Sequence, residues 1–250
     1  MEELSAPKSR SNWDEERSAF SCLFMLSAII VAAGNSQRMG FDKLFALLND
    51  KPVVAHTISA FENADCVGEI VVVGRGDRVG ELEELVRQSA FRKVVQVIAG
   101  GEQRQDSVRQ GLERIGDGAH YVAVHDAARP LITPEQIARV LSAAREHGAA
   151  ALAEPVTDTL KRADENSLVT GGVSREGLFA MQTPQIFERD LLRAAYQTIQ
   201  KKSLTVTDEV SAVEQHGGKV VLVSNDDWNV KITYPRDLLL AQSALARRSS

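Results

Sequence analysis

Short apolar runs alternate with amphipathic segments along most of this chain. The apolar runs lie at Ala28–Val31, Ile70–Val73, Val94–Ile98, Tyr121–Val124 and Ala149–Leu152. Between them, apolar residues recur with helical spacing at Pro52–Asn63, Val79–Ser89, Arg104–Ile115 and Pro134–His147. Continuous apolar runs are typical of strands that are buried on both faces. Their alternation with helices predicts an α/β protein whose mostly parallel sheet is covered by helices on both faces.

The helix predicted at Pro134–His147 has clear end signals. Thr133 is suited to cap its amino end, Pro134 fits the first helical position, and Gly148 can end the helix. Further along the chain, the pattern predicts helices at Arg189–Gln200, Asp208–His216 and Arg236–Arg247, and a strand at Val220–Val223.

Two parts of the chain depart from this rhythm. Residues 1–26 show no helical or strand periodicity, and we interpret them as a disordered tail that precedes one domain at 27–250. A second stretch, at about 155–181, is extended and turn-rich, with two glycines in its middle. Because this stretch has too few apolar residues for a core of its own, we expect an arm that projects from the sheet.

Composition narrows the classes of function. The 250 residues are 44% hydrophobic and 25% charged, as in an ordinary globular protein. The net charge of -5 does not favour nucleic acid, so an anionic ligand would need a local cluster of cations.

Cys22 and Cys66 have neither metal-ligand nor disulfide spacing, which suits a reducing compartment such as the cytoplasm. The apolar run at Phe20–Ala33 is too short and interrupted to span a membrane, and a glycine loop directly after it favours a buried strand over a signal segment.

The loop after the first predicted strand has the composition of a phosphate site. Gly34 and Gly40 allow backbone N–H groups to approach an anion, and Arg38 and Lys43 add two cations. The loop lacks the Gly-Lys-Ser/Thr ending of a Walker A motif and the glycine spacing of a dinucleotide fingerprint. Taken alone, it fits equally well a plain strand-to-helix connection with two solvated cations.

Two more loops follow predicted strands, where ligands of open α/β sheets bind. In the first, Gly100 and Gly101 permit close backbone approach, and Arg104 and Ser107 offer polar contacts at a helix amino end. The second begins at His125 and reads His-Asp-Ala-Ala-Arg-Pro. Its aspartate is a candidate Mg²⁺ ligand, since Mg²⁺ takes one or two carboxylates and completes its shell with phosphates and water. The alternatives are an ion pair between Asp126 and Arg129, and a purely structural histidine.

Polar clusters in the last third of the chain are less specific. Thr157–Arg162 and Arg175 lie in the predicted arm, where they also fit a solvated hairpin. Thr205–Glu209 fits a helix cap followed by two carboxylates. Asn229–Thr233 is interpreted as a short apolar strand that contains Lys231.

Taken in order from about Ser27 to Ala246, these segments resemble 2-C-methyl-D-erythritol 4-phosphate cytidylyltransferases, enzymes of non-mevalonate isoprenoid synthesis. The motifs are Ala-Ala-Gly-x-x-x-Arg-Met at Ala32 with Lys43, Gly-Gly-x-x-Arg-x-x-Ser at Gly100, His-Asp-Ala-Ala-Arg-Pro at His125, Pro-Val-x-Asp-Thr-x-Lys-Arg at Pro155, Thr-Pro-Gln at Thr183, Thr-Asp-Glu at Thr207 and Asn-x-Lys-x-Thr at Asn229. The resemblance implies a single Rossmann-like nucleotidyltransferase domain that uses CTP and a polyol phosphate.

The resemblance also implies roles for individual residues. The implied catalytic residues are Arg38, Lys43, Asp126 and Lys231. CTP would be bound by Ala32, Ala33, Gly34, Gly101, Glu102, Arg104 and Ser107, and the acceptor by Arg129, Thr159, Arg175 and Thr207. Asp126 would also hold Mg²⁺ or another divalent cation. Thr159 and Arg175 would reach a neighbouring subunit through the arm, which implies a homodimer.

The chain departs from the family pattern at Glu102, where Asp is expected, and at Trp228, where a small or acidic residue is more usual. Two alternatives stay open: a ribitol 5-phosphate cytidylyltransferase, and a nucleotide-binding module without catalysis. Ribitol phosphate enzymes more often carry Val at the position of Ala128, which favours methylerythritol phosphate. That acceptor is a phosphate monoester with a second pKa of about 6, so it is largely ionised at neutral pH and needs no general base.

Overall fold

The computed structural model describes residues 25–34 and 42–248 of the chain. The first strand begins at Met25, two residues before the predicted start of the domain. The rest of the predicted tail and Arg38 lie outside the described residues. Within the described ranges, no helix is both long and apolar enough to cross a membrane.

A seven-stranded sheet forms the centre of the molecule, in the order β11-β7-β10-β6-β1-β4-β5. Every pairing in it is parallel except those of β10, which runs antiparallel to both β6 and β7. The strands are β1 (Met25–Ala32), β4 (Val67–Gly74), β5 (Val94–Ala99), β6 (Ala119–Asp126), β7 (Ala149–Pro155), β10 (Phe179–Glu188) and β11 (Val221–Ser224). A small pair joins β2 (Leu47–Leu48) to β3 (Lys51–Pro52).

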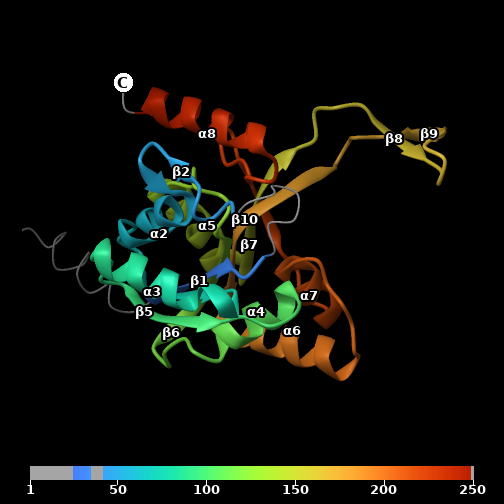
Figure 1. The fold of residues 1–250 in the computed structure, drawn as a ribbon. Coiled ribbons are helices and arrows are strands. Elements are labelled where there is room, and N and C mark those ends of the chain that lie inside the picture. Colours follow the sequence, from blue (N-terminus) through green and yellow to red (C-terminus); the bar gives the residue numbers. More distant parts are fainter. Residues whose placement is uncertain (1–24, 35–41, 249–250) are drawn as a thin grey trace, which may run out of the picture.

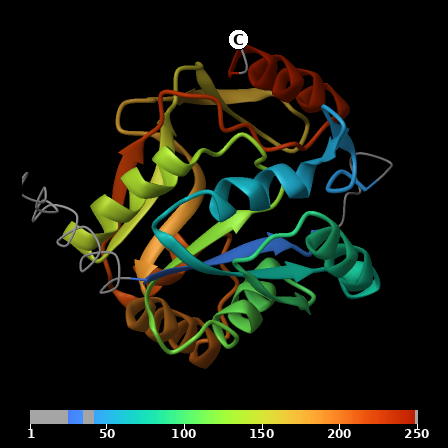
Figure 2. The ribbon, with the colours of Figure 1, turned by 90° about the vertical axis from the view of Figure 1, so that its left-hand side faces the viewer.

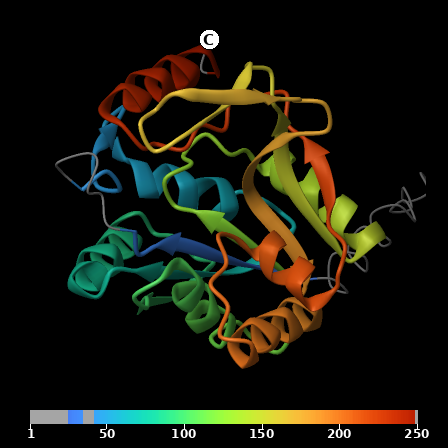
Figure 3. The ribbon, with the colours of Figure 1, turned by 90° about the vertical axis from the view of Figure 1, so that its right-hand side faces the viewer.

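Helices cover both faces of this sheet, as Figures 2 and 3 show from opposite sides. They are α2 (Val53–Glu62), α3 (Val79–Gln88), α4 (Arg104–Leu112), α5 (Pro134–His147), α6 (Arg189–Lys201), α7 (Glu209–His216) and α8 (Pro235–Arg248), with a 3₁₀ turn, η1, at Gly76–Arg78. The helices α2 and α5 lie on one face, and α4, α6 and α7 lie on the other. The last helix, α8, packs near β2 and the start of α2 around Leu48 and Val53.

The two apolar layers follow from the two-residue period of the strands. Along β1, Ala28 and Ile30 pack with the side chains of α2 and α5, and Ile29 packs with those of α4 and α6. All three side chains are fully buried. A strand buried on both faces cannot alternate apolar with polar residues, so it reads as an unbroken apolar run.

The predicted fold class is therefore confirmed, and so are the end signals of α5. The hydroxyl of Thr133 accepts a hydrogen bond from the N–H of Gln136, and Gly148 ends the helix with φ of 80°. Two details of the prediction were wrong. The strand β10 was not predicted, and Asn229–Thr233 is not a strand in the structure.

The expected arm projects from the main body as a hairpin (Figure 1). It consists of β8 (Leu160–Ala163) and β9 (Val169–Val173), paired antiparallel. Near its tip, Leu168 and Val169 are 65% and 66% exposed. The arm makes its own two-stranded sheet and adds no strand to the central one.

The order of the strands fixes where a ligand can bind. After β1 the chain continues to β4 and β5 on one side, and β6 then pairs with β1 on the other side. A reversal of this kind leaves a crevice outside the carboxyl ends of the two adjacent strands, β1 and β6, because the connections that follow them run in opposite directions. Those ends carry Ala32 and Asp126, which places both beside the crevice.

Candidate active site

A cleft of about 250 Å³ lies at the carboxyl ends of β1 and β6. It contains all the residues expected to bind CTP, together with three of the four expected catalytic residues. Those lining residues are Ala32, Ala33, Gly34, Gly101, Glu102, Arg104, Ser107, Lys43, Asp126 and Lys231. The fourth catalytic candidate, Arg38, lies outside the described residues.

The glycine loop between β5 and α4 packs closely against its neighbours. A Cβ atom on Gly100 would lie 2.5 Å from the Ser107 Oγ, and one on Gly101 would lie 2.4 Å from the Cβ of Asp106. The N–H of Gly101 donates a hydrogen bond to the Ser107 hydroxyl at 3.2 Å. The two glycines therefore allow the loop to fold onto the start of α4, with Gly101, Glu102 and Arg104 left along the wall of the cleft.

Asp126 is the charged centre of the cleft. Its Oδ2 accepts a hydrogen bond from the Lys231 Nζ at 2.7 Å, and its Oδ1 accepts one from the Arg104 Nε at 3.2 Å. A third cation, Arg129, has its Nε 4.0 Å from Oδ2. Burial disfavours the charged carboxylate, but Arg104 and Lys231 outweigh it and hold the pKa of Asp126 well below its ordinary value.

The segment before α8 places Lys231 beside Asp126 and contacts Lys43, which lines the same cleft. The N–H of Ile232 donates to the Ala128 carbonyl at 2.8 Å, which ties this segment to the loop after β6. The Lys43 Nζ donates to the Ile232 carbonyl at 2.8 Å. One attached segment therefore supplies Lys231 and also positions Lys43.

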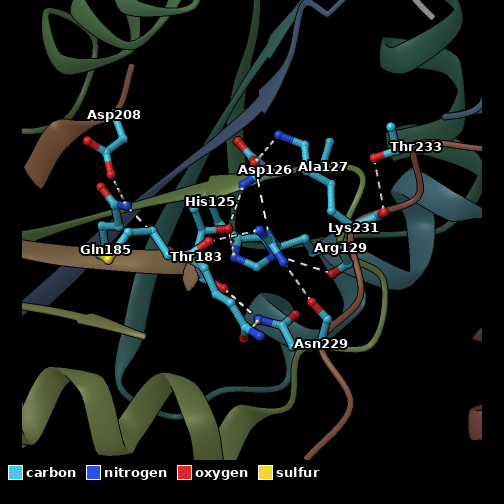
Figure 4. A network of polar contacts seen from close by, with 12 residues as sticks. His125, Asp126, Ala127, Arg129, Thr183, Gln185, Asp208, Asn229, Lys231 and Thr233 are labelled. Carbon is cyan, nitrogen blue, oxygen red and sulfur yellow. Dashed lines mark hydrogen bonds and ion pairs between the residues drawn. The ribbon is translucent and has the colours of Figure 1, made fainter. Parts of the chain in front are cut away.

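His125 lies behind the cleft, fully buried, and its hydrogen bonds indicate its tautomer (Figure 4). The Thr183 hydroxyl accepts from the N–H of Asp126 at 3.1 Å and lies 3.0 Å from the His125 Nδ1. If that hydroxyl gives its single proton to Nδ1, the ring proton belongs on Nε2, which lies 3.3 Å from the Arg129 carbonyl. Burial lowers the pKa of His125 to about 3, so the ring is neutral. This arrangement supports a structural histidine that holds the loop carrying Asp126 and Arg129.

The depressed pKa of His125 predicts a specific pH dependence of stability. The folded state keeps the ring neutral to about pH 3, whereas a histidine in the unfolded chain binds a proton below about pH 6.5. The contribution of the neutral His125 ring to the free energy of unfolding is therefore complete above pH 6.5 and is lost as the pH falls toward 3. We expect the free energy of unfolding, measured with urea between pH 7 and pH 4, to fall more steeply for the wild type than for His125→Gln. Parallel curves would contradict the prediction.

Arg129 is largely buried beside the cleft, with its side chain 11% exposed. Its NH1 donates to the Asn229 carbonyl at 2.8 Å and its NH2 to the Met181 carbonyl at 3.4 Å. Burial lowers its pKa. Arg129 and Lys231 both line a neighbouring cavity of about 490 Å³, and because Lys231 also lines the cleft, this lysine connects the two spaces.

Like Arg129, the three other residues expected to bind the acceptor do not line the cleft of their own chain. Thr159 and Arg175 are exposed at the base of the arm, where the Arg175 NH1 donates to the Thr157 carbonyl. Thr207 is exposed just before α7, 3.4 Å from the Ser211 hydroxyl. The residue after it, Asp208, caps α7 by accepting from the N–H of Ser211.

The two residues that depart from the family pattern, Glu102 and Trp228, lie in different surroundings. Glu102 is exposed on the wall of the cleft. Trp228 is 46% exposed and lines the neighbouring cavity instead.

A divalent metal fits this site only if the nucleotide brings part of its shell. In the described ranges, no three His, Cys, Asp or Glu side chains gather in a way that could hold a metal ion. Both oxygens of Asp126 already contact cations. One carboxylate is nevertheless enough when phosphates and water supply the other ligands, as they do for Mg²⁺ in nucleotide sites.

Comparison with known proteins decides the family. The sequence model of the family described as 2-C-methyl-D-erythritol 4-phosphate cytidylyltransferase matches residues 26–247. This chain belongs to that family. The resemblance inferred from the ordered motifs is therefore confirmed.

Relatives in the cytidylyltransferase family are similar over nearly the whole domain. A protein of that name from Dehalococcoides mccartyi (strain CBDB1) is 41% identical over 223 residues, which are 89% of this chain and 96% of the relative. The crystal structure of the Thermus thermophilus enzyme of the same name has a TM-score of 0.73 and 32% identity, covering 88% of this chain and 98% of that one. A 4-diphosphocytidyl-2C-methyl-D-erythritol synthase from Anaerococcus prevotii DSM 20548 has a TM-score of 0.79 and 26% identity, covering 90% and 99%.

Sequence reasoning gave no role to several residues that support the cleft. Glu209 and Tyr196 form a buried hydrogen-bonded pair behind Arg104, and Gln103 lines the cleft itself. Thr183 appeared only as part of a motif. The Thr-Asp-Glu motif at Thr207 could have indicated a role for Glu209 in the site, but helix capping was a sufficient explanation for the same residues.

Proposed function

We propose that this protein transfers the cytidylyl group of CTP to 2-C-methyl-D-erythritol 4-phosphate, with release of pyrophosphate and formation of 4-diphosphocytidyl-2-C-methyl-D-erythritol. One observation carries the proposal: a glycine-walled cleft at the switch point of the sheet holds Lys43, Arg104 and Lys231 around a buried carboxylate, Asp126. Family membership and the names of the relatives support the same reaction.

The wall of the cleft suits a nucleoside triphosphate. Ala32, Ala33 and Gly34 follow β1, and Gly101, Glu102 and Ser107 flank the start of α4. In the proposal, backbone groups of these two loops contact the base and ribose, and Arg104 supports the second loop. Apart from Glu102, these residues have small side chains or none, which lets a flat base lie close to the backbone. The triphosphate then extends toward Lys43.

The transfer needs charge compensation and no proton abstraction. An oxygen of the acceptor phosphate attacks the α-phosphorus of CTP, and the bond from that phosphorus to the oxygen bridging to the β-phosphorus breaks. The acceptor phosphate is largely a dianion at neutral pH, so no general base is needed. Lys43 and Arg38 offset the charge that develops on the α-phosphate, and Lys231 helps bring two mutually repelling anions together.

A divalent cation, Mg²⁺ in our proposal, is expected to reach the site with CTP. Bound there, it would neutralise charge on the triphosphate. Asp126 is the residue that would hold it, and Arg104 and Lys231 keep that carboxylate ionised. Because the same two cations oppose a bare metal ion, we propose that metal binding requires the nucleotide.

The acceptor site is proposed to need a second subunit. Arg129 lines the neighbouring cavity, with its Nε 4.0 Å from the Oδ2 of Asp126 in the cleft, but Thr159 and Arg175 lie on the arm, away from the cleft of their own chain. The exposed apolar residues near the tip of the arm favour burial against a partner. We therefore propose a homodimer in which each arm brings Thr159 and Arg175 to the other subunit's site.

Subunit mixing tests the shared site. Arg175→Ala is expected to remove an acceptor contact from the partner's site, and Lys43→Ala to inactivate the site of its own chain. After unfolding and refolding together, the two inactive proteins should regain part of the wild-type activity, because mixed dimers hold one intact site. Two proteins of unchanged fold that regain no activity after mixing, or a fully active monomer by light scattering, would contradict the shared site.

Pyrophosphate release tests the proposed reaction and its substrates. Each of four nucleoside triphosphates is paired with methylerythritol phosphate and with ribitol 5-phosphate. We expect release with CTP and a higher kcat/KM for methylerythritol phosphate, by about ten- to two-hundredfold, since one methyl group in a fitted pocket contributes that much. A preference for ribitol phosphate would change the substrate assignment. CTP binding without release would favour a non-catalytic module.

A reducing intracellular location is part of the same proposal. The substrates are soluble phosphates, and Cys66 is a free, half-buried thiol. The acceptor and CTP require no nucleic acid or membrane partner.

A further inference from the structure

Behind the cleft, a buried carboxylate contacts Arg104, an arginine that directly follows the glycine loop and also contacts Asp126. The Glu209 Oε1 accepts a hydrogen bond from the Arg104 NH1 at 2.7 Å and another from the Tyr196 hydroxyl at 3.0 Å. The Nε of the same arginine donates to Asp126 at 3.2 Å. Arg104 therefore joins two carboxylates, one buried and one in the cleft.

Of the three side chains in this chain of contacts, that of Glu209 is the most deeply buried. The side chain of Arg104 is 27% exposed and that of Asp126 is 12% exposed, whereas that of Glu209 is 1% exposed. Within the described part of the chain, the second oxygen of Glu209 is buried without a hydrogen-bond partner. An ion pair in such surroundings is weak evidence for a purely stabilising role, because packed apolar residues often do as well.

The backbone that carries Glu209 is itself held in place. The Gln185 Oε1 accepts from the N–H groups of Glu209 and Val210, both at 3.2 Å. Asp208 caps the helix and accepts from the Gln185 Nε2 at 3.0 Å. Figure 4 shows this contact between Asp208 and Gln185, beside the group around Asp126. The position of the Glu209 carboxylate is therefore fixed by β10 and by the start of α7.

We propose that Glu209 is a positioning residue for cytidylyl transfer and acts through Arg104. The fixed charge of Glu209 holds one end of the Arg104 guanidinium. Arg104 can then support the glycine loop and share the Asp126 carboxylate with Lys231, without covering that carboxylate. Without that charge, Asp126 is the remaining carboxylate partner of Arg104. The guanidinium then shifts toward Asp126 and away from the nucleotide loop. This inference rests on the proposed function.

A double-mutant cycle separates this role from simple stabilisation. Glu209→Gln, Arg104→Gln and the double variant are compared with the wild type in pyrophosphate release from CTP and methylerythritol phosphate. We expect Glu209→Gln to lower kcat/KM for CTP about tenfold and to leave the KM of the acceptor within about twofold. In the Arg104→Gln protein, the same change should alter kcat/KM for CTP less than about twofold.

Tyr196→Phe is the matched control, because it removes a hydrogen bond to the same oxygen and keeps the charge of Glu209. It should change kcat/KM for CTP less than about threefold. Thermal unfolding confirms that each protein is folded. If Glu209→Gln does not fold, Glu209→Asp replaces it, since it keeps the charge but withdraws it from Arg104, and a smaller loss with the same dependence on Arg104 is expected.

Equal losses in the wild-type and Arg104→Gln backgrounds would overturn the proposal, and so would wild-type kinetics for Glu209→Gln. Failure of the proposed function gives a different result: the wild type then binds CTP and releases no pyrophosphate. In that case, titration calorimetry with CTP gives the dissociation constants of the same four proteins. Additive effects on those constants would also overturn the action of Glu209 through Arg104.

Discussion

Replacement of Asp126 by Asn is expected to lower the kcat of cytidylyl transfer at least a hundredfold, because one preorganised electrostatic contact typically contributes that much. The amide keeps the shape of the side chain but loses the charge that balances Lys231 and Arg104 at 2.7 and 3.2 Å. It is also a far weaker ligand for a divalent ion. Steady-state pyrophosphate release at saturating CTP measures the effect.

Asp190→Asn is a matched control for this substitution. Asp190 has an 85% exposed side chain, contacts Arg189 at 3.4 Å and lies outside the cleft. It should keep wild-type activity, and thermal unfolding should show that both variants are folded. An Asp126→Asn protein with a kcat within about threefold of the wild type would contradict the role of this carboxylate.

The second large effect is expected for Lys43→Ala, with a kcat about a hundredfold below that of the wild type. The ammonium group of Lys43 lines the cleft and is held by the Ile232 carbonyl at 2.8 Å, so its charge is placed before the substrate arrives. Its loss removes a cation from the transferring phosphate and leaves the walls of the cleft in place. The expected decrease is therefore mainly in kcat, measured by the same assay.

Lys93→Ala provides the comparison for Lys43→Ala. Lys93 also donates to a backbone carbonyl at 2.8 Å, that of Ala64, but it does not line the cleft. A similar loss in both variants would point to a general effect of removing a half-buried lysine contact. Near-normal kcat in Lys43→Ala would contradict its assigned role.

The parallel core could be predicted because short stretches of sequence are enough to identify its strands and helices. Buried strands such as β1 read as apolar runs, and α5 carries its own cap and stop in Thr133 and Gly148. The rule that ligands bind at the carboxyl ends of strands then placed Ala32, Gly101 and Asp126 in one cleft without any knowledge of distances.

The strand β10 could not be predicted because its burial depends on distant partners. Its central residues are Gln182, Thr183, Pro184 and Gln185, and a proline among polar residues argues against a central strand. In the fold, Gln182 contacts Glu154, and Gln185 contacts Asp208. Pro184 lies where the pairing of β10 with β7 shifts register. None of these compensations is visible in a local window.

The same limit applied to the supports of the site. Glu209 accepts a hydrogen bond from Arg104, which is 105 positions away in the sequence. The Thr-Asp-Glu motif that contains Glu209 was already explained by helix capping. Asn229–Thr233 has the composition of a short strand, but the bond from Ile232 to Ala128 attaches it to a loop and not to the sheet. Sequence motifs therefore identified the groups in the cleft but not what holds them.

The most direct test of the central claim follows the α-phosphorus of CTP. The purified protein is incubated with Mg²⁺, methylerythritol phosphate and CTP that carries a label on its α-phosphate. We predict that the label moves into a diphosphate that joins cytidine to methylerythritol, and that the released pyrophosphate is unlabelled. Label recovered in CMP, or remaining in CTP while the protein binds it, would contradict cytidylyl transfer to this acceptor.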